Sequence, residues 1–245
     1  MYQILLRFYE ELNDFLPRER RKVQFAHILS GKVSIKDVIE SLGIPHTEVD
    51  LILVNHLSVD FAYIVQPGDR ISVYPLFESF DISPITRLRP QPLRETRFVL
   101  DVHLGKLAVY LRFLGFDTLY RNDYTDETLA QISVAEKRIL LTRDRNLLKR
   151  SLITHGYYVR AIYPKQQLAE ILRRLQLSPP YPSLSRCTLC NAPLTPIAKE
   201  QIGHRLPPDT QKYYHQFYTC QYCEKIYWKG SHYQNMQKCI QEILT

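Results

Sequence analysis

Four aspartates in the middle of the sequence stand where apolar runs that read as buried strands come to an end. They are Asp101, Asp123, Asp126 and Asp144. Carboxylates that meet in one place cannot all stay ionised without a counter-charge, and carboxylate oxygens suit Mg²⁺ or Mn²⁺. Such ions activate water and stabilise the charge that develops on a phosphodiester. These residue types therefore predict metal-dependent hydrolysis of phosphodiester bonds.

Basic side chains lie near the same aspartates in the sequence. They are Arg121, Arg143, Arg145, Lys149 and Arg150. Residues 97–178 carry 14 basic against 8 acidic side chains, whereas residues 1–80 have a net charge of −3. Lys and Arg neutralise the phosphates of a nucleic-acid backbone, so the pattern favours RNA or DNA as a partner of the middle region. A basic soluble surface without a polyanion partner is the alternative.

Three of the aspartates also have a structural interpretation to be weighed. Asp126 lies in the first turn of a helix that Thr125 is expected to cap, where the helix dipole favours acids. Asp144 fits the N-cap of another helix. Asp101 is harder to explain in this way, because strands disfavour Asp and ionised carboxylates resist burial. The neighbouring His103 is interpreted as a structural residue.

Four cysteines near the C-terminal end form a second centre. Cys187 and Cys190 make one C-x₂-C pair, Cys220 and Cys223 make another, and 29 residues separate the pairs. This spacing is typical of four thiolates around a tetrahedral, structural zinc ion, and disulfides are the alternative. Cys239 is left over and is interpreted as a packing residue. The aromatic and basic run 225–236 that follows can stack bases or can simply cover the zinc knuckle.

The elements that must position the aspartates alternate between strand and helix. Apolar periodicity predicts strands over 98–102, 116–120, 138–142 and 157–162, and helices over 104–115, 126–137, 144–152 and 164–177. Repeated βα units form a parallel sheet covered by helices, and ligands gather beyond the carboxyl ends of its strands. If neighbouring strands carry the aspartates, their side chains meet at one edge.

A different pattern occupies the first part of the chain. Extended stretches are expected over 2–9, near 22–26, and over 50–55, 58–65 and 70–76, with one helix around 34–44. Ser34 is the expected N-cap of that helix. The order ββαβββ describes a small sheet crossed by a single helix.

Proline-bearing stretches divide the sequence into three modules. We expect an N-terminal domain over 1–80, a linker over 81–96, an α/β domain over 97–178, and a cysteine module with a terminal helix over 186–245. With 245 residues and 45% hydrophobic content the chain can bury several cores. The sequence shows no membrane span, secretion signal, Walker motif or serine-hydrolase elbow, so a cytoplasmic protein without membrane association is expected.

The middle and C-terminal regions resemble a known family. The motifs "FVLDVHLGKLAVYLRFLGFDTLYRNDYTDETLA" and "RILLTRDRNLL", together with the cysteine module, are similar to the PIN-like ribonuclease domain of the Mut-seven C-terminal family over residues 97–236. The resemblance implies a PIN-like fold whose acids bind divalent metal and cleave RNA. By motif these acids are Asp101, Asp126 and Asp144; the match does not fix the role of Asp123.

The N-terminal region resembles another family. The stretch "LILVNHLSVDFAYIVQPGDRISVYP" is similar to the β-grasp, ubiquitin-like sulfur carriers. Sulfur carriage needs a free C-terminal Gly-Gly tail, and this sequence continues instead into "LFESFDIS". A docking or scaffolding role, with a protein partner, is therefore favoured over sulfur carriage.

The sequence as a whole predicts a metal-dependent ribonuclease. Its cofactors would be catalytic Mg²⁺ or Mn²⁺ and structural zinc, and its partners RNA and possible protein ligands of the β-grasp domain. Two alternatives remain. One is a non-catalytic RNA-binding or ribosome-associated adaptor whose acids are helix caps, and the other is an RNA-modification partner recruited through the β-grasp domain.

Overall fold

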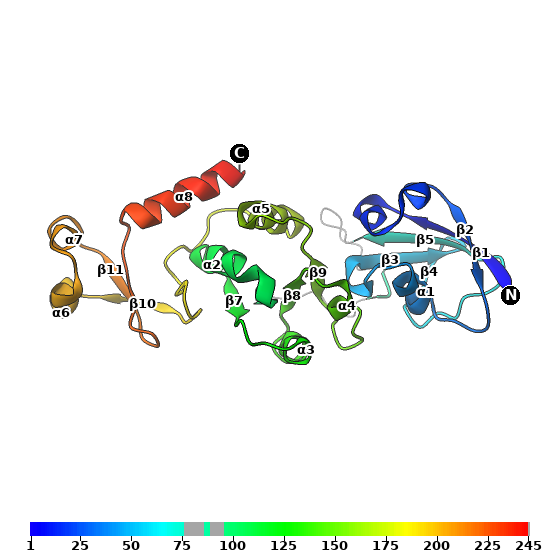
Figure 1. Cartoon of the computed structure of the whole chain (residues 1–245), viewed down its shortest axis with the longest axis horizontal. Helices are drawn as coiled ribbons and strands as arrows, with labels where there is room; N and C mark the ends of the chain where they lie inside the picture. Colours follow the sequence, from blue (N-terminus) through cyan, green and yellow to red (C-terminus); the bar gives the residue numbers. More distant parts are fainter. Residues whose placement is uncertain (76–85, 89–95, 245) are drawn as a thin grey trace. The chain divides into compact units, whose positions relative to one another are not determined.

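The computed structural model describes residues 1–75, 86–88 and 96–244 (Figure 1). The chain forms two compact units. The first contains Met1–Glu95 and Thr125–Tyr158, and the second contains Thr96–Tyr124 and Val159–Thr245. Most of the predicted linker, 81–96, lies outside the described residues. Among the described residues, no helix combines the length and apolar character that crossing a membrane requires.

The first unit begins with a five-stranded sheet of order β2-β1-β5-β3-β4. Its elements are β1 (Tyr2–Phe8), η1 (Glu10–Phe15), η2 (Arg18–Arg20), β2 (Phe25–Leu29), α1 (Ile35–Ser41), η3 (His46–Glu48), β3 (Val49–Val54), β4 (Leu57–Ser58) and β5 (Arg70–Pro75). The central strands β1 and β5 are parallel, and the other neighbours are antiparallel. This is the single-helix sheet that the sequence predicts.

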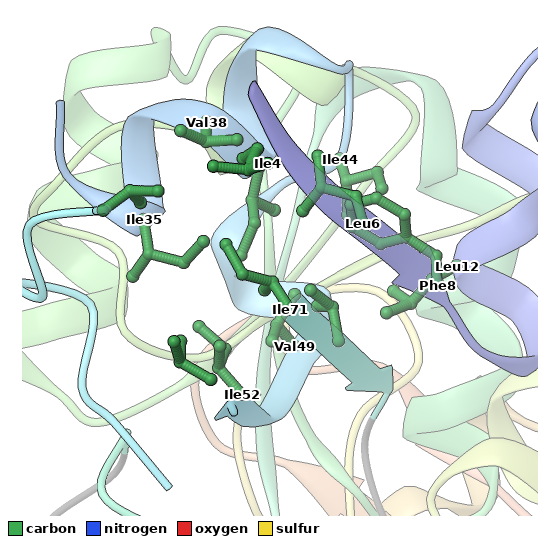
Figure 2. Packing of buried hydrophobic residues seen from close by; sticks show 14 of the residues in the cluster. Ile4, Leu6, Phe8, Leu12, Ile35, Val38, Ile44, Val49, Ile52 and Ile71 are labelled. Carbon is green, nitrogen blue, oxygen red and sulfur yellow. The ribbon is translucent and has the colours of Figure 1, made fainter. Parts of the chain in front are cut away.

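Alternating residues of the strands build the core of this sheet domain. Ile4, Leu6 and Phe8 of β1 are buried on one face, as strand periodicity requires. Ile35 and Val38 of α1 belong to the same buried cluster (Figure 2). Ser34 caps α1 as predicted, because its hydroxyl accepts a hydrogen bond from the Asp37 N–H at 3.1 Å.

Two strand predictions in this domain need correction. The second strand begins three residues later than expected, at Phe25. The stretch 58–65 is not a strand beyond β4; it turns, and residue Ile64 makes a single bridge with Ser34. Residues 59–65 turn because of contacts with Asp69, whose carboxylate accepts hydrogen bonds from the Tyr63 hydroxyl and the Gln66 N–H. These bonds hold the chain in a turn that apolar periodicity does not reveal.

The first unit also contains part of the βα region. Its elements are α3 (Asp126–Ala135), β8 (Ile139–Thr142), α4 (Arg145–Leu148) and β9 (Gly156–Tyr158). Strands β8 and β9 pair in parallel, as predicted. The helix α4 has four residues, and β9 has three, so both are shorter than the apolar pattern suggests.

The second unit contains the other βα elements. They are β6 (Arg97–Leu100), η4 (Val102–Leu104), α2 (Gly105–Phe113), β7 (Asp117–Tyr120) and α5 (Pro164–Arg174). Strands β6 and β7 pair in parallel, and α2 packs against both β7 and α5. Leu107, Ala108 and Leu111 form the buried face of α2, which is the apolar face that the sequence predicts.

The cysteine module completes the second unit. Its elements are β10 (Leu194–Ile197), α6 (Lys199–Ile202), η5 (Gly203–Arg205), α7 (Pro208–Tyr213), β11 (Phe217–Cys220), β12 (Ile226–Tyr227) and α8 (Ser231–Leu244). The three strands form an antiparallel sheet in the order β10-β11-β12. Ile202, Leu206 and Phe217 form a small core. So small an apolar core needs an additional stabilising element. The chain is thus a mixed α/β protein with an N-terminal sheet domain, parallel βα units and a C-terminal cysteine module.

Candidate active site and metal centre

Asp101 directly follows the buried strand β6. Phe98, Val99 and Leu100 are fully buried, and the Asp101 side chain is 7% exposed. Its Oδ1 accepts a hydrogen bond from the Val102 N–H at 2.6 Å and caps the short helix η4. A buried strand therefore delivers this carboxylate to the point where the chain turns into a helix.

The turn after Asp101 is shaped by a tyrosine from β7. The Tyr120 hydroxyl donates a hydrogen bond to the Val102 carbonyl oxygen at 3.0 Å. A Cβ atom at Gly105 would lie 2.7 Å from the same hydroxyl oxygen. A side chain at this position of the "LGKLA" motif would therefore have to push aside the Tyr120 ring that contacts the turn.

Asp123 is exposed and engaged with one arginine. Its two carboxylate oxygens accept hydrogen bonds from Arg121 Nε at 2.9 Å and Nη2 at 2.7 Å. The hydrogen bond from Arg121 lowers the pKa of Asp123 below its usual value. Two residues predicted for different roles, one acidic and one phosphate-binding, thus pair with each other.

Asp126 is the first residue of α3. Thr125 caps the helix by accepting a hydrogen bond from the Thr128 N–H at 3.2 Å. The Asp126 side chain is exposed, and its Oδ2 lies 3.7 Å from Arg150 Nη2. The structural interpretation of this acid, favoured by a helix dipole, is therefore compatible with the geometry.

Asp144 follows the buried strand β8 and caps α4. Its Oδ1 accepts a hydrogen bond from the Asn146 N–H at 2.7 Å, while its own N–H donates to the Thr142 hydroxyl at 2.8 Å. The side chain is exposed. The cap orients one carboxylate oxygen toward the helix and leaves the residue at the surface.

Two of the predicted phosphate ligands make contacts within the first unit. The Arg145 guanidinium lies 4.9 Å from the ring centroid of Phe15 and 5.1 Å from that of Tyr158. Lys149 Nζ donates a hydrogen bond to the Glu40 carbonyl oxygen at 2.8 Å. Arg143 is half-buried and also engaged. The basic residues near Asp144 are therefore partly occupied with holding α4 against the N-terminal sheet domain.

Sequence reasoning missed two residues of η3 in this contact. His46 Nε2 donates a hydrogen bond to the Ile153 carbonyl oxygen at 2.8 Å, and its Nδ1 lies 2.7 Å from Glu40 Oε1. Glu48 is 2% exposed, and its Oε1 accepts a hydrogen bond from the Tyr158 N–H at 2.6 Å. The sequence shows only a Glu between a proline and an apolar strand, and this pattern does not reveal that the side chain is buried.

The four predicted catalytic acids are divided between the two units. Asp101 and Asp123 belong to the second unit, and Asp126 and Asp144 belong to the first. Asp101 and Asp144 occupy similar local positions, because each lies within two residues of the end of a parallel strand and caps the next helix. Their convergence on one metal ion stays a prediction.

The four cysteines do come together. Their Sγ atoms all lie within 4.8 Å of one another. The Cys187–Cys223 and Cys190–Cys220 sulfur distances are 3.5 and 3.4 Å, and none of the cysteines forms a disulfide. Tetrahedral coordination with Zn–S bonds of about 2.3 Å places sulfurs roughly 3.8 Å apart. The cluster therefore fits a four-thiolate zinc site.

Burial opposes the charged form of two of the four thiols, so a bound cation would be needed to hold all four as thiolates. Burial raises the pKa of Cys190 to about 12 and raises that of Cys223. Burial also raises the pKa of Cys187, but hydrogen bonds from the Tyr227 hydroxyl and from backbone N–H groups outweigh it and bring the value to about 6. Four thiolates side by side need a positive ion, and a bound metal ion supplies it.

Three further polar residues join the cysteine module to the βα elements of the second unit. Buried Arg112 donates hydrogen bonds to the Thr118 and Leu189 carbonyl oxygens, both at 2.8 Å. Asn191 accepts a hydrogen bond from the Thr118 N–H at 2.9 Å and donates to Asp117 at 2.8 Å. Arg186 Nη2 lies 3.2 Å from the same Asp117 carboxylate. None of these residues was identified from the sequence.

The fold and the cysteine cluster define an α/β protein with a candidate metal centre. Comparison with family models places it more narrowly: the Mut7-C RNAse domain matches residues 96–240, and the Mut7-C ubiquitin domain matches residues 1–81. The chain belongs to the Mut7-C RNAse family and carries the ubiquitin-like domain at its N-terminal side. Both resemblances inferred from the motifs are therefore confirmed. No significant match was found among curated proteins or among solved structures.

Proposed function

We propose that this protein is a divalent-metal-dependent ribonuclease that hydrolyses RNA phosphodiester bonds. The observation that carries the proposal is the placement of Asp101 and Asp144, which follow the buried parallel strands β6 and β8 in a chain of the Mut7-C RNAse family. Family membership supports a nuclease role in general. The metal requirement and the carboxylate site are what the proposal adds.

Asp101, Asp126 and Asp144 would hold one or two Mg²⁺ or Mn²⁺ ions, with Asp123 as a further candidate ligand. Their carboxylate oxygens are the donors that these hard ions prefer. When bound, such an ion supplies an activated water and neutralises charge on the phosphate. In the reaction the water oxygen bonds to phosphorus, the bridging P–O bond breaks, and the departing oxygen leaves as a hydroxyl after receiving a proton.

The RNA backbone would be held by arginines and lysines around these acids. Arg121, Arg143 and Arg150 are the candidates whose contacts leave them at or near the surface. Arg145 and Lys149 also remain candidates, but their contacts with Phe15, Tyr158 and Glu40 suggest that positioning α4 is their larger role. Phosphate contacts of this kind set affinity and its dependence on salt.

The remaining parts of the proposal concern organisation. We assign the domains as 1–80, 97–178 and 186–245, joined by the linker 81–96, with zinc as the structural ion of the last. The N-terminal domain offers a surface for a protein partner. Four reduced cysteines suit a reducing compartment, so the cytoplasm is the proposed location.

The test compares cleavage of end-labelled single-stranded and hairpin RNA by the wild-type chain and by Asp144→Asn. Asn is as good an N-cap as Asp, so the substitution keeps α4 and removes the charge. Cleavage should require added Mg²⁺ or Mn²⁺ and should fall at least about 100-fold in the variant, because even indirect changes around a metal site cost 10–100-fold.

The matched control is Glu19→Gln, which removes one exposed carboxylate from η2, outside the segments that carry the four aspartates. It should leave the cleavage rate within about twofold, since surface substitutions away from a site have small effects. RNA binding without cleavage by the wild-type chain, with both metals and several RNAs, would instead favour the adaptor function.

A further inference from the structure

A cavity of about 260 Å³ lies in the second unit, where α2, β12 and the beginning of α8 approach one another. Val109 and Phe113 of α2 form one side, and Tyr227, Trp228 and Tyr233 contribute aromatic walls. Pockets for drug-sized ligands begin at about 300 Å³. This cavity therefore suits a smaller planar group.

The aromatic walls are held in place by packing and hydrogen bonds. The ring centroids of Phe113 and Tyr233 lie 5.2 Å apart, and the Tyr233 hydroxyl is 2.9 Å from the Ser183 hydroxyl. The Tyr227 hydroxyl lies 3.1 Å from Cys187 Sγ. The wall is thus built before any ligand arrives, which reduces the entropic cost of binding.

The Trp228 indole lies close against the backbone of Gly230. A Cβ atom at Gly230 would lie 2.8 Å from Trp228 Cδ1 and closer still to Nε1. The indole therefore occupies space that a side chain at position 230 would need. Its ring also packs against Phe217, with centroids 6.3 Å apart, while the residue remains partly exposed. A partly exposed, immobilised indole is a surface on which a nucleobase can stack.

The rim of the cavity is basic. Arg186, Lys225 and His232 line it, with Arg186 in an ion pair with Asp117, and among the described lining residues none is Asp or Glu. Lys225 is exposed, with Nζ 5.4 Å from the ring centroid of Tyr227. The amino end of the 14-residue helix α8 also borders the cavity, and helix amino ends attract anions. An aromatic wall beside a cationic rim matches a base attached to a phosphate.

We propose that this cavity binds one nucleobase of a single-stranded RNA segment, with the adjoining phosphate at Lys225. The inference rests on RNA being the substrate and adds a recognition site outside the acidic residues. The base stacks on the aromatic wall, and the rim neutralises backbone charge. The cysteine module thereby holds RNA while the acids act on it.

The chain contains a single tryptophan, Trp228, and it lines this cavity, so its fluorescence can report binding there. The full-length Asp144→Asn chain is titrated with hexaribonucleotides of adenine or uracil and with an abasic hexamer that carries the same phosphates. We expect saturable quenching with the base-containing hexamers and much weaker quenching with the abasic one, because stacking needs the base ring.

Two substitutions test the cavity directly, each with a matched control. Val109→Phe fills the cavity, whereas Val134→Phe adds the same bulk to another helix; the two valines are 39% and 42% exposed. We expect affinity for the hexamer to fall about tenfold in Val109→Phe, as for the loss of one stacked base, and to be unchanged in Val134→Phe.

Lys225→Gln should make the negative slope of log affinity against log salt concentration shallower by about 0.7. Lys229→Gln, which lies outside the lining, should change that slope less.

Equal affinity for base-containing and abasic hexamers, or full affinity after both Val109→Phe and Lys225→Gln, would overturn the proposal. Cleavage of labelled RNA is followed in parallel with the wild-type chain. Base-dependent quenching without cleavage would retain the cavity and reject the ribonuclease function. Cleavage without base-dependent quenching would retain the ribonuclease function and reject base binding in the cavity.

Discussion

At the scale of single residues, helix capping and the proposed metal binding would place compatible demands on the same carboxylates. Asp101 and Asp144 each give one oxygen to the N–H of a following residue, at 2.6 and 2.7 Å. Such a bond restricts the side-chain rotamer and fixes where the second oxygen points. The helix-cap interpretation, weighed against catalysis in the sequence, therefore describes how the carboxylate is positioned and does not exclude metal binding.

The first prediction concerns Asp101→Asn. Asn keeps the acceptor for the Val102 N–H, so thermal unfolding should change little. Loss of the charge should lower the cleavage rate at least about 100-fold and raise the Mg²⁺ concentration needed for half-maximal rate. Asp37→Asn, in the first turn of the capped helix α1, is the control and should behave like the wild-type chain. An unchanged Mg²⁺ dependence would remove Asp101 from the site.

At the scale of elements, the N-terminal sheet domain packs against β9 and α4 within the first unit. Its helix η3 contacts β9 and the loop before it through His46 and Glu48. Phe15 and Tyr158 pack with their ring centroids 5.6 Å apart, and the guanidinium of Arg145 lies near both. The segment that carries Asp144 is therefore packed on this domain inside the first unit. A short helix such as α4 depends on this packing, since four residues cannot sustain a helix alone.

The second prediction tests this contact through Glu48→Ala. The substitution leaves the Tyr158 N–H without its buried acceptor, which costs about 1–3 kcal/mol. The free energy of unfolding, measured with urea, should fall by that amount. Glu19→Ala removes an exposed carboxylate from η2 and should shift the urea midpoint hardly at all. Equal midpoints for the two variants would contradict the role of Glu48.

The third prediction concerns the attachment of the cysteine module. Arg112 is 3% exposed and donates to the Thr118 and Leu189 carbonyl oxygens. Arg112→Met keeps the apolar stem and removes the donors, so unfolding free energy should fall by at least about 2 kcal/mol. The change is read from urea unfolding followed by Trp228 fluorescence. Arg173→Met, which changes an exposed arginine of α5 in the same way, is the control and should give the wild-type urea unfolding curve.

At the scale of the whole molecule, stability is unevenly supplied. The N-terminal sheet domain has a large buried cluster, whereas one apolar cluster of the described cysteine module contains only three buried side chains. A module with so little apolar burial depends on cross-links such as a bound metal ion. The two parts should therefore respond differently when metal is removed.

The fourth prediction follows from this difference. The purified chain should contain about one zinc ion per molecule by elemental analysis, and Cys187→Ser should lose it. Chelation should shift Trp228 emission to longer wavelength as the C-terminal module opens, while most far-ultraviolet ellipticity remains. Cys239→Ser should keep the zinc, because Cys239 lies outside the four-thiol cluster. Zinc retained in Cys187→Ser would contradict the assignment of the site.

The sequence by itself determined the features that depend on near neighbours. The spacing of the cysteine pairs predicted the cluster, and Ser34 and Thr125 were correctly expected to cap helices. Asp144 also caps a helix, which was the alternative weighed against its catalytic role. Motifs also identified both family domains. Capping and periodicity involve residues within one or two turns of each other, so the local sequence contains the information.

Only the tertiary structure decided which polar groups meet across the chain. The sequence predicted Arg145 and Lys149 as phosphate ligands. In the structure Arg145 contacts Phe15 and Lys149 contacts Glu40, and both partners lie more than 100 residues away in the sequence. Arg112 read as one residue of an amphipathic helix, yet it is buried among carbonyl oxygens from β7 and the first cysteine pair. Burial and long-range hydrogen bonds depend on which distant segments pack together, and no local pattern encodes that choice.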